Sequence, residues 1–116
     1  DATHLLEGES PVEVVRGVIG FPVPGHTKGS VLWHVDGHLL FSGDSLSWDP
    51  KRERLHAFRR ACWYSWEAQT ASLERFVDSG LPFDRLFCGH GWSHDLDADD
   101  FHDHLEALVG RMATQA

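Results

Sequence analysis

Three short glycine-flanked segments each carry one side chain that can bind a metal ion. The segments are Pro24-Gly25-His26-Thr27-Lys28-Gly29-Ser30, Phe41-Ser42-Gly43-Asp44-Ser45 and Phe87-Cys88-Gly89-His90-Gly91-Trp92. Imidazole nitrogen and carboxylate oxygen are the ligands that zinc and related divalent metals accept. Glycine lacks a Cβ, so the backbone can take the sharp turn that aims a neighbouring ligand inward. The segments therefore predict a metal site formed by His26, Asp44 and His90.

The order of these segments resembles the later motifs of the metallo-β-lactamase fold superfamily, which are Gly-His-Thr-x-Gly-Ser, Gly-Asp and Gly-His-Gly. The resemblance covers residues 20 to 92. In that family the His matching His26 completes one metal position, the Asp matching Asp44 bridges two metals, and the His matching His90 serves the second metal. The resemblance implies zinc, with iron or manganese as alternatives, and hydrolysis by a metal-activated water, whose pKa a metal lowers towards about 7.

The first motif of the family, His-x-His-x-Asp-His, does not occur in the sequence. In the family this motif supplies most of the remaining ligands and the Asp that orients the nucleophile. We therefore expect the chain to be part of a longer polypeptide and to hold metal weakly alone, and we assign no catalytic residue. Three functions stay open. The chain is a partial metal-dependent hydrolase, a degenerate non-catalytic scaffold that dimerises or binds a partner, or a protein with redox chemistry at an iron centre.

A second, narrower resemblance lies in the segment Cys62-Trp63-Tyr64-Ser65-Trp66-Glu67 with Gln69-Thr70. It is similar to a little-characterised bacterial and plant group of the superfamily, in which some members carry a ferredoxin-like segment. The first metal motif of that group is often altered to something like His-Arg-Asp-Asp. The two cysteines of this chain lack the spacing of an iron–sulfur site, so the ferredoxin-like part lies outside it.

Apolar runs before the three segments predict the strands that position their side chains. The expected strands are at residues 12–15, 18–23, 30–35, 38–41 and 83–88. Asp36-Gly37 predicts a two-residue hairpin turn, since both positions of such a turn need positive φ. The segment from residue 45 to 64 has no clear period, which predicts a long covering loop.

Two helices complete the expected fold. Ser65 is the predicted N-cap of a helix that runs to Asp78 and stops at Gly80, and Asp97 or Asp99 caps a last helix that runs to Met112. The fold class is α+β, an antiparallel or mixed sheet with helices on one face, in a single unit of residues 1–116. The family fold is an αβ/βα sandwich of two similar halves, and this chain resembles the C-terminal half.

Helices on one face would leave the other face of the sheet without a cover. Burial of apolar surface is worth roughly 25 cal/mol per Å², so an apolar face of several hundred Å² is costly to leave in water. We therefore predict a partner sheet on this face. It is either the missing N-terminal half or a second copy of the chain in an isologous homodimer.

Composition narrows the partners and the location. Lys plus Arg number 10 against 18 Asp plus Glu, a net charge of −8 that argues against nucleic acid. A basic cluster of Lys51, Arg52, Arg54, Arg59 and Arg60 favours a solvated loop, with an anionic substrate as the alternative. The absence of a membrane-spanning run and the low cysteine count predict a cytoplasmic protein, in which Cys88 is a buried free thiol.

The other histidines and the hydroxyl residues of the first segment are expected to be structural. His34 and His38 flank the hairpin turn and are predicted to face solvent. His94 is predicted to lie in an exposed loop instead of ligating the metal. Thr27 and Ser30 are predicted to hydrogen-bond within their turn, because short hydroxyl side chains satisfy nearby backbone groups.

Overall fold

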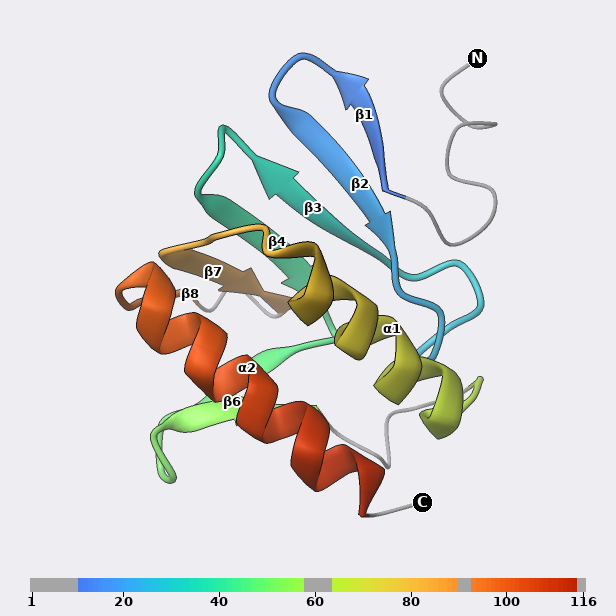
Figure 1. Cartoon of the computed structure of the whole chain (residues 1–116), viewed down its shortest axis with the longest axis vertical. Helices are drawn as coiled ribbons and strands as arrows, with labels where there is room; N and C mark the ends of the chain where they lie inside the picture. The colour runs from blue at the N-terminus through green and yellow to red at the C-terminus, as the bar shows by residue number, and fades with distance from the viewer. Residues whose placement is uncertain (1–10, 58–63, 90–92, 115–116) are drawn as a thin grey trace.

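The computed structural model describes residues 11–57, 64–89 and 93–114 of the chain (Figure 1). In chain order its elements are β1 (Val12–Val15), β2 (Val18–Pro22), β3 (Val31–Val35), β4 (Leu39–Gly43), β5 (Ser47–Asp49), β6 (Arg54–His56), α1 (Trp66–Ser79), β7 (Arg85–Cys88), β8 (Ser93–Asp95) and α2 (Ala98–Ala113). Strands and helices are thus mixed along the chain, which confirms the predicted α+β class.

One six-stranded sheet has the order β1-β2-β3-β4-β7-β8, and β5 pairs with β6 in a separate hairpin. Neighbouring strands of the large sheet are antiparallel except β4 and β7, which are parallel and place Leu40 opposite Leu86. The connection from β4 to β7 contains the β5–β6 hairpin and α1, as a parallel pair requires a long crossover. The sheet is therefore mixed, as predicted.

The turn between β3 and β4 has the positive φ angles predicted from Asp36-Gly37, but three residues separate the strands instead of two. Asp36 has φ 54° and Gly37 has φ 80°, and the amide of His38 donates to the carbonyl of Val35 at 3.2 Å. Positive φ at both central positions gives the turn a twist that matches that of the two strands. Val35 pairs with Leu39 and not with His38, so His38 is an extra residue in this connection.

The helices begin and end near the predicted residues. The Ser65 side chain accepts a hydrogen bond from the amide of Ala68 at 3.1 Å, and Gly80 ends α1 with φ 70°. Asp97 precedes α2, but its side chain makes no capping hydrogen bond. Within the described residues, no helix has the length and apolar character needed to cross a membrane.

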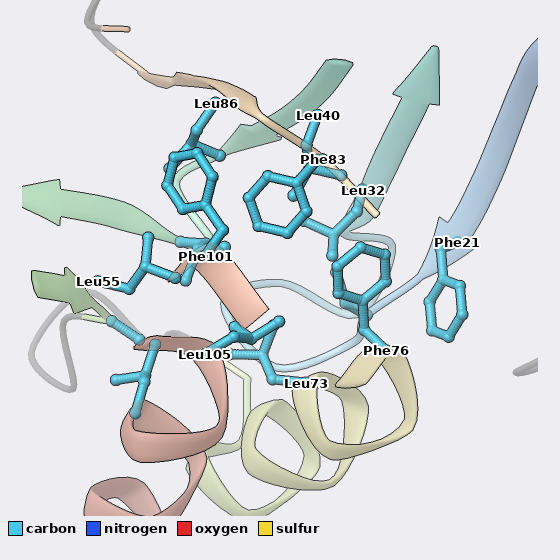
Figure 2. Packing of buried hydrophobic residues seen from close by; sticks show 14 of the residues in the cluster. Phe21, Leu32, Leu40, Leu55, Leu73, Phe76, Phe83, Leu86, Phe101 and Leu105 are labelled. Atoms are coloured by element: carbon cyan, nitrogen blue, oxygen red, sulfur yellow. The ribbon is translucent and has the colours of Figure 1, made fainter. Parts of the chain in front are cut away.

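Both helices cover the same face of the sheet and pack against each other (Figure 1). Figure 2 shows leucine and phenylalanine side chains meeting between the two layers. Sheet residues Leu32, Leu40 and Leu86 are 0% exposed, as is Leu73 of α1. Phe76 of α1 contacts the Phe21 ring edge to face, with 5.2 Å between the ring centroids. One contiguous core therefore holds the helices to the sheet.

The opposite face of the sheet also carries apolar side chains, next to the exposed Arg85–Asp95 ion pair. The registers place Trp33 beside Phe41 and Phe41 beside Phe87, and cross-strand partners share a face. The rings of Phe41 and Phe87 are stacked with 4.5 Å between their centroids, and Phe41 is 39% exposed. We call this set the open face: Val31, Trp33, Val35, Leu39, Phe41 and Phe87.

The segment from residue 45 to 64 was predicted to be a covering loop, and this is wrong for much of it. It contains the β5–β6 hairpin, in which Trp48 pairs with Leu55 and Leu55 is 0% exposed. Each strand has only three residues, and a charged turn separates them. The alternation is thus too short to show as a period, although Leu55 packs in the core and anchors the hairpin.

The prediction that His34 faces solvent is also wrong. His34 is 3% exposed, and its Nε2 lies 2.6 Å from the carbonyl oxygen of Pro82. The cause is the two-residue period of a strand, which puts His34 on the same face as the buried Leu32. The other half of the prediction holds, because the His38 side chain is 55% exposed.

Candidate metal centre

The metal-competent segments follow three strands that point in the same direction. β2 and β4 both run antiparallel to β3, and β7 runs parallel to β4. The carboxyl ends of β2, β4 and β7 therefore lie at one edge of the sheet, where α/β folds commonly bind ligands. We call this the carboxyl-end edge. Gly25, Gly43 and Gly89 follow or end these strands, so all three segments start there.

The loop that carries His26 is fastened to the start of α1. The carbonyl of Gly25 accepts hydrogen bonds from the amides of Tyr64 and Ser65, at 3.1 and 3.0 Å. A Cβ on Gly25 would collide with the backbone and Cβ of Gln69 in the first turns of α1. Only glycine therefore allows this loop to approach the helix so closely.

Thr27 and Ser30 close the same loop, as predicted. Their hydroxyl oxygens are 2.8 Å apart, and the Ser30 hydroxyl also accepts from the Thr27 amide at 3.0 Å. The amide of Val23 donates to the Ser30 carbonyl at 2.8 Å, where the chain returns towards β3. These bonds restrict the backbone on both sides of His26, which limits the positions open to its ring.

Asp44 follows β4 in a turn that side chains hold in place. Gly43 has φ 54°, a left-handed conformation that favours glycine. The buried Ser42 hydroxyl donates to the carbonyl of Leu46 at 2.6 Å, and Gln69 Nε2 donates to the carbonyl of Ser45 at 3.0 Å. Gln69 thus packs against the Gly25 loop and bonds the Asp44 turn, which couples the positions of the two predicted ligands.

His26 and Asp44 come together at the carboxyl-end edge. His26 Nε2 lies 3.7 Å from Asp44 Oδ2, and the side chains are 16% and 47% exposed. This separation is too long for a hydrogen bond. Two ligands at about 2.05 Å from a tetrahedral zinc ion would be about 3.3 Å apart, so the pair suits a shared cation after a shift of a few tenths of an ångström.

The third segment reaches the same place with its backbone. A Cβ on Gly89 would collide with Asp44 Oδ1, so the chain after β7 passes directly beside the carboxylate. His90, the next residue, lies outside the described residues. Over the described ranges 11–57, 64–89 and 93–114, no group of three His, Cys, Asp or Glu side chains forms a metal site. Two predicted ligands are therefore observed together, and the third remains a prediction.

A cavity of about 870 Å³ opens beside this edge. Its lining includes Cys88 and Gly89 at the end of β7, Trp48 of the hairpin, and His94 of β8. Trp48 and His94 are stacked, with 4.0 Å between ring centroids and 12° between planes. The volume is in the range of small-molecule sites.

The prediction of an exposed loop for His94 is wrong, because it pairs with Leu86 in β8 and is partly buried against Trp48. A strand of three residues carries too little alternation to be found from sequence.

Cys88 is half-buried, and burial is the main cause that raises the pKa of its thiol, against hydrogen bonds from Trp48, Ser42 and Ser47. It is thus a protonated thiol near neutral pH, a poor metal ligand and nucleophile.

Comparison of the chain with protein-family models and with curated proteins found no match. The similarity to the metallo-β-lactamase superfamily thus depends on the three segments and their order alone.

Proposed function

We propose that the chain is the C-terminal half of a metal-dependent hydrolase with a metallo-β-lactamase-like fold. Its ligands are His26, Asp44 and His90, for zinc or else iron or manganese. The observation that carries this proposal is the 3.7 Å approach of His26 Nε2 to Asp44 Oδ2 at the edge where β2, β4 and β7 end. A bound metal would activate water for attack on the substrate.

The described residues support particular roles at such a centre. The His26 ring is mostly buried and its loop is closed by hydrogen bonds, which suits a fixed ligand. The Asp44 carboxylate is half-exposed, which leaves access for water and substrate. The neighbouring cavity, with the Trp48 ring in its wall, has room for the organic part of a substrate. A half-buried thiol at Cys88 suits a reducing compartment, and we propose the cytoplasm.

Metal affinity measured on paired variants tests this proposal. We expect zinc, added in competition with a chromogenic chelator, to bind at least tenfold more weakly after Asp44→Ala or His26→Ala. The matched controls are Asp84→Ala and His38→Ala, which remove a second His–Asp pair at the opposite edge of the sheet. Equal zinc affinity in all four variants and the unmodified chain would contradict the proposed centre.

The open face favours a second candidate function, in which the chain is a non-catalytic scaffold that assembles through its sheet. The stacked rings of Phe41 and Phe87 lie on the face opposite the two helices, and we propose that a second copy or the missing N-terminal half covers them. Burial of these side chains would supply the association free energy.

Sedimentation velocity at several concentrations tests this assembly. We expect the chain alone to form a dimer, and Phe41→Glu to convert it to a folded monomer, since a buried unpaired carboxylate is costly. Tyr64→Glu is the matched control, because Tyr64 is 54% exposed and lies outside the sheet. A monomer at all concentrations would exclude the homodimer, and mixing with the N-terminal half would then test the other partner.

A further inference from the structure

A cluster of positive charge lies on the β5–β6 hairpin and the end of α2, apart from the His26–Asp44 pair. Arg54 and His56 are the first and last residues of β6, and Arg111 is in the last turn of α2. Arg111 Nη2 donates to the carbonyl of Leu55 at 2.8 Å, which brings its guanidinium onto β6 between the other two residues. Residues distant in the sequence thus place three basic side chains together.

Arg54 is poorly satisfied in this cluster. The residue is half-buried, and its Nε is shut off from solvent without a hydrogen-bond partner among the described residues. A buried, unpaired polar atom costs about 1 to 3 kcal/mol, and more when the group is charged. Buried polar atoms in proteins usually have a hydrogen-bond partner, so the unmet Nε of Arg54 needs an explanation.

The positive charges of the basic groups also repel one another. Burial is the main cause that lowers the pKa of Arg111, and the charge of Arg54 adds to it. Burial likewise lowers the pKa of His56, with Arg52, Arg54 and Arg111 acting in the same direction and Asp49 against them. The protonated form of His56 is therefore disfavoured mainly by burial, and the charges of the three arginines add to this effect.

Asp49 is a carboxylate that faces this cluster, and it already accepts hydrogen bonds within the hairpin turn. Asp49 Oδ1 accepts from the amides of Lys51 and Arg52, at 3.0 and 3.3 Å, and Oδ2 lies 3.7 Å from Arg52 Nη1. Among the described residues, the charges that act on His56 are thus one carboxylate and three arginines, in a chain whose net charge is −8. Positive charge gathered at half-buried positions of a chain with a negative net charge indicates an anionic ligand.

We propose that Arg54, Arg111 and His56 bind the phosphate group of a small molecule. A phosphate dianion supplies two negative charges and several acceptor oxygens, which match two guanidinium groups with fork-shaped donors. A carboxylate monoanion would leave part of the cationic charge uncompensated. Neither guanidinium lines the cavity beside the carboxyl-end edge, so this site is distinct from that cavity.

Binding of inorganic phosphate tests the site directly. We expect amide shifts in β6 and the last turn of α2 on titration at constant ionic strength, and an affinity at least tenfold lower in Arg54→Gln. Arg85→Gln is the matched control, because Arg85 is an exposed strand arginine that pairs with Asp95 at 2.9 Å. Equal loss in both variants, or no binding by the unmodified chain, would overturn the proposal.

Two further measurements separate phosphate recognition from general charge or misfolding. Phosphate should raise the pKa of His56, followed by the NMR shifts of its imidazole, because a dianion favours the protonated ring among Asp49, Arg52, Arg54 and Arg111. Acetate at the same ionic strength should bind at least tenfold more weakly, and equal binding would reject phosphate as the ligand. Arg111→Gln should also weaken phosphate binding at least tenfold. If that variant fails to fold because the bond to the Leu55 carbonyl is lost, Arg111→Lys keeps the charge and should still bind more weakly, since it lacks the fork of donors.

Discussion

Two opposite edges of the same sheet each carry a histidine beside an aspartate. At the carboxyl-end edge, His26 Nε2 lies 3.7 Å from Asp44 Oδ2. At the other edge, which we call the amino-end edge, His38 Nδ1 lies 2.9 Å from Asp84 Oδ1, and both side chains are more than half exposed. The shorter contact is a surface hydrogen bond that joins the starts of β4 and β7, where the Asp84 amide also donates to the His38 carbonyl at 3.0 Å.

The comparison shows that the distance between two side chains does not by itself identify a site. What differs is the backbone around each pair. At the carboxyl-end edge, added Cβ atoms on Gly25 and Gly89 would collide with Gln69 and with the Asp44 carboxylate. At the amino-end edge, a Cβ on Gly37 would meet nothing within 4 Å. Glycine is needed for close approach to a backbone and a carboxylate at the first edge. At the second edge a Cβ on Gly17 would meet only the end of the Asp36 side chain, at 3.1 Å, and Gly37 is needed for turn geometry alone.

The largest predicted effect is that of Gly25→Ala. Its Cβ would overlap the Gln69 backbone, and a helix backbone cannot move aside as a side-chain end can. We expect the free energy of unfolding to fall by about 3 kcal/mol or more, measured by urea denaturation. The control at the other edge is Gly37→Ala, where φ is 80° and a loss of about 1 to 2 kcal/mol is expected from the left-handed backbone. Similar losses for both variants would remove the distinction between the edges.

The next effect concerns the two histidines near the amino-end edge. We expect His34→Ala to cost about 2 to 4 kcal/mol, since it leaves a buried space and an unpaired Pro82 carbonyl. His38→Ala, on the exposed side of the same turn, should change stability by less than about 0.5 kcal/mol. Thermal unfolding of both variants at one pH checks this. A stable His34→Ala variant would contradict the structural role assigned to its ring.

Much of the carboxyl-end edge could be predicted from sequence because each segment follows its own strand. Asp36-Gly37 sets β3 and β4 antiparallel, and that pairing fixes which strand ends share an edge. Local signals of this kind, including the Ser65 cap of α1, need no distant partner. The approach of His26 to Asp44 could therefore be predicted from the sequence.

The walls of the cavity and the grouping of Arg54 and His56 with Arg111 could not be predicted in the same way. The stacking of Trp48 on His94 joins two strands of three residues from different parts of the chain. Arg54 and Arg111 meet because α2 lies along β6, a packing that neither local pattern encodes. Contacts of this kind depend on the tertiary arrangement, which overrides short sequence patterns.

A smaller stability effect, but a selective one, is predicted for Gly89→Ala. Its Cβ would meet the end of the Asp44 side chain, which can rotate away, so we expect a loss of about 1 kcal/mol or less. The displaced carboxylate would no longer lie beside His26, and zinc affinity should fall at least tenfold. Chelator competition and urea denaturation on the same variant check both parts. Unchanged zinc affinity would show that Asp44 is no ligand, or that its position does not depend on Gly89.

The smallest effect separates the two pairs by their coupling. A double-mutant cycle with His38→Ala and Asp84→Ala should give a coupling free energy of about 0.2 to 1 kcal/mol, falling as salt rises, because the pair is exposed. The same cycle on His26 and Asp44 should give a coupling that grows when zinc is added, because both side chains then bind one ion. If the coupling free energy between His26 and Asp44 does not change when zinc is added, the two pairs are equivalent. Only the contacts of Gly25 and Gly89 would then distinguish the edges.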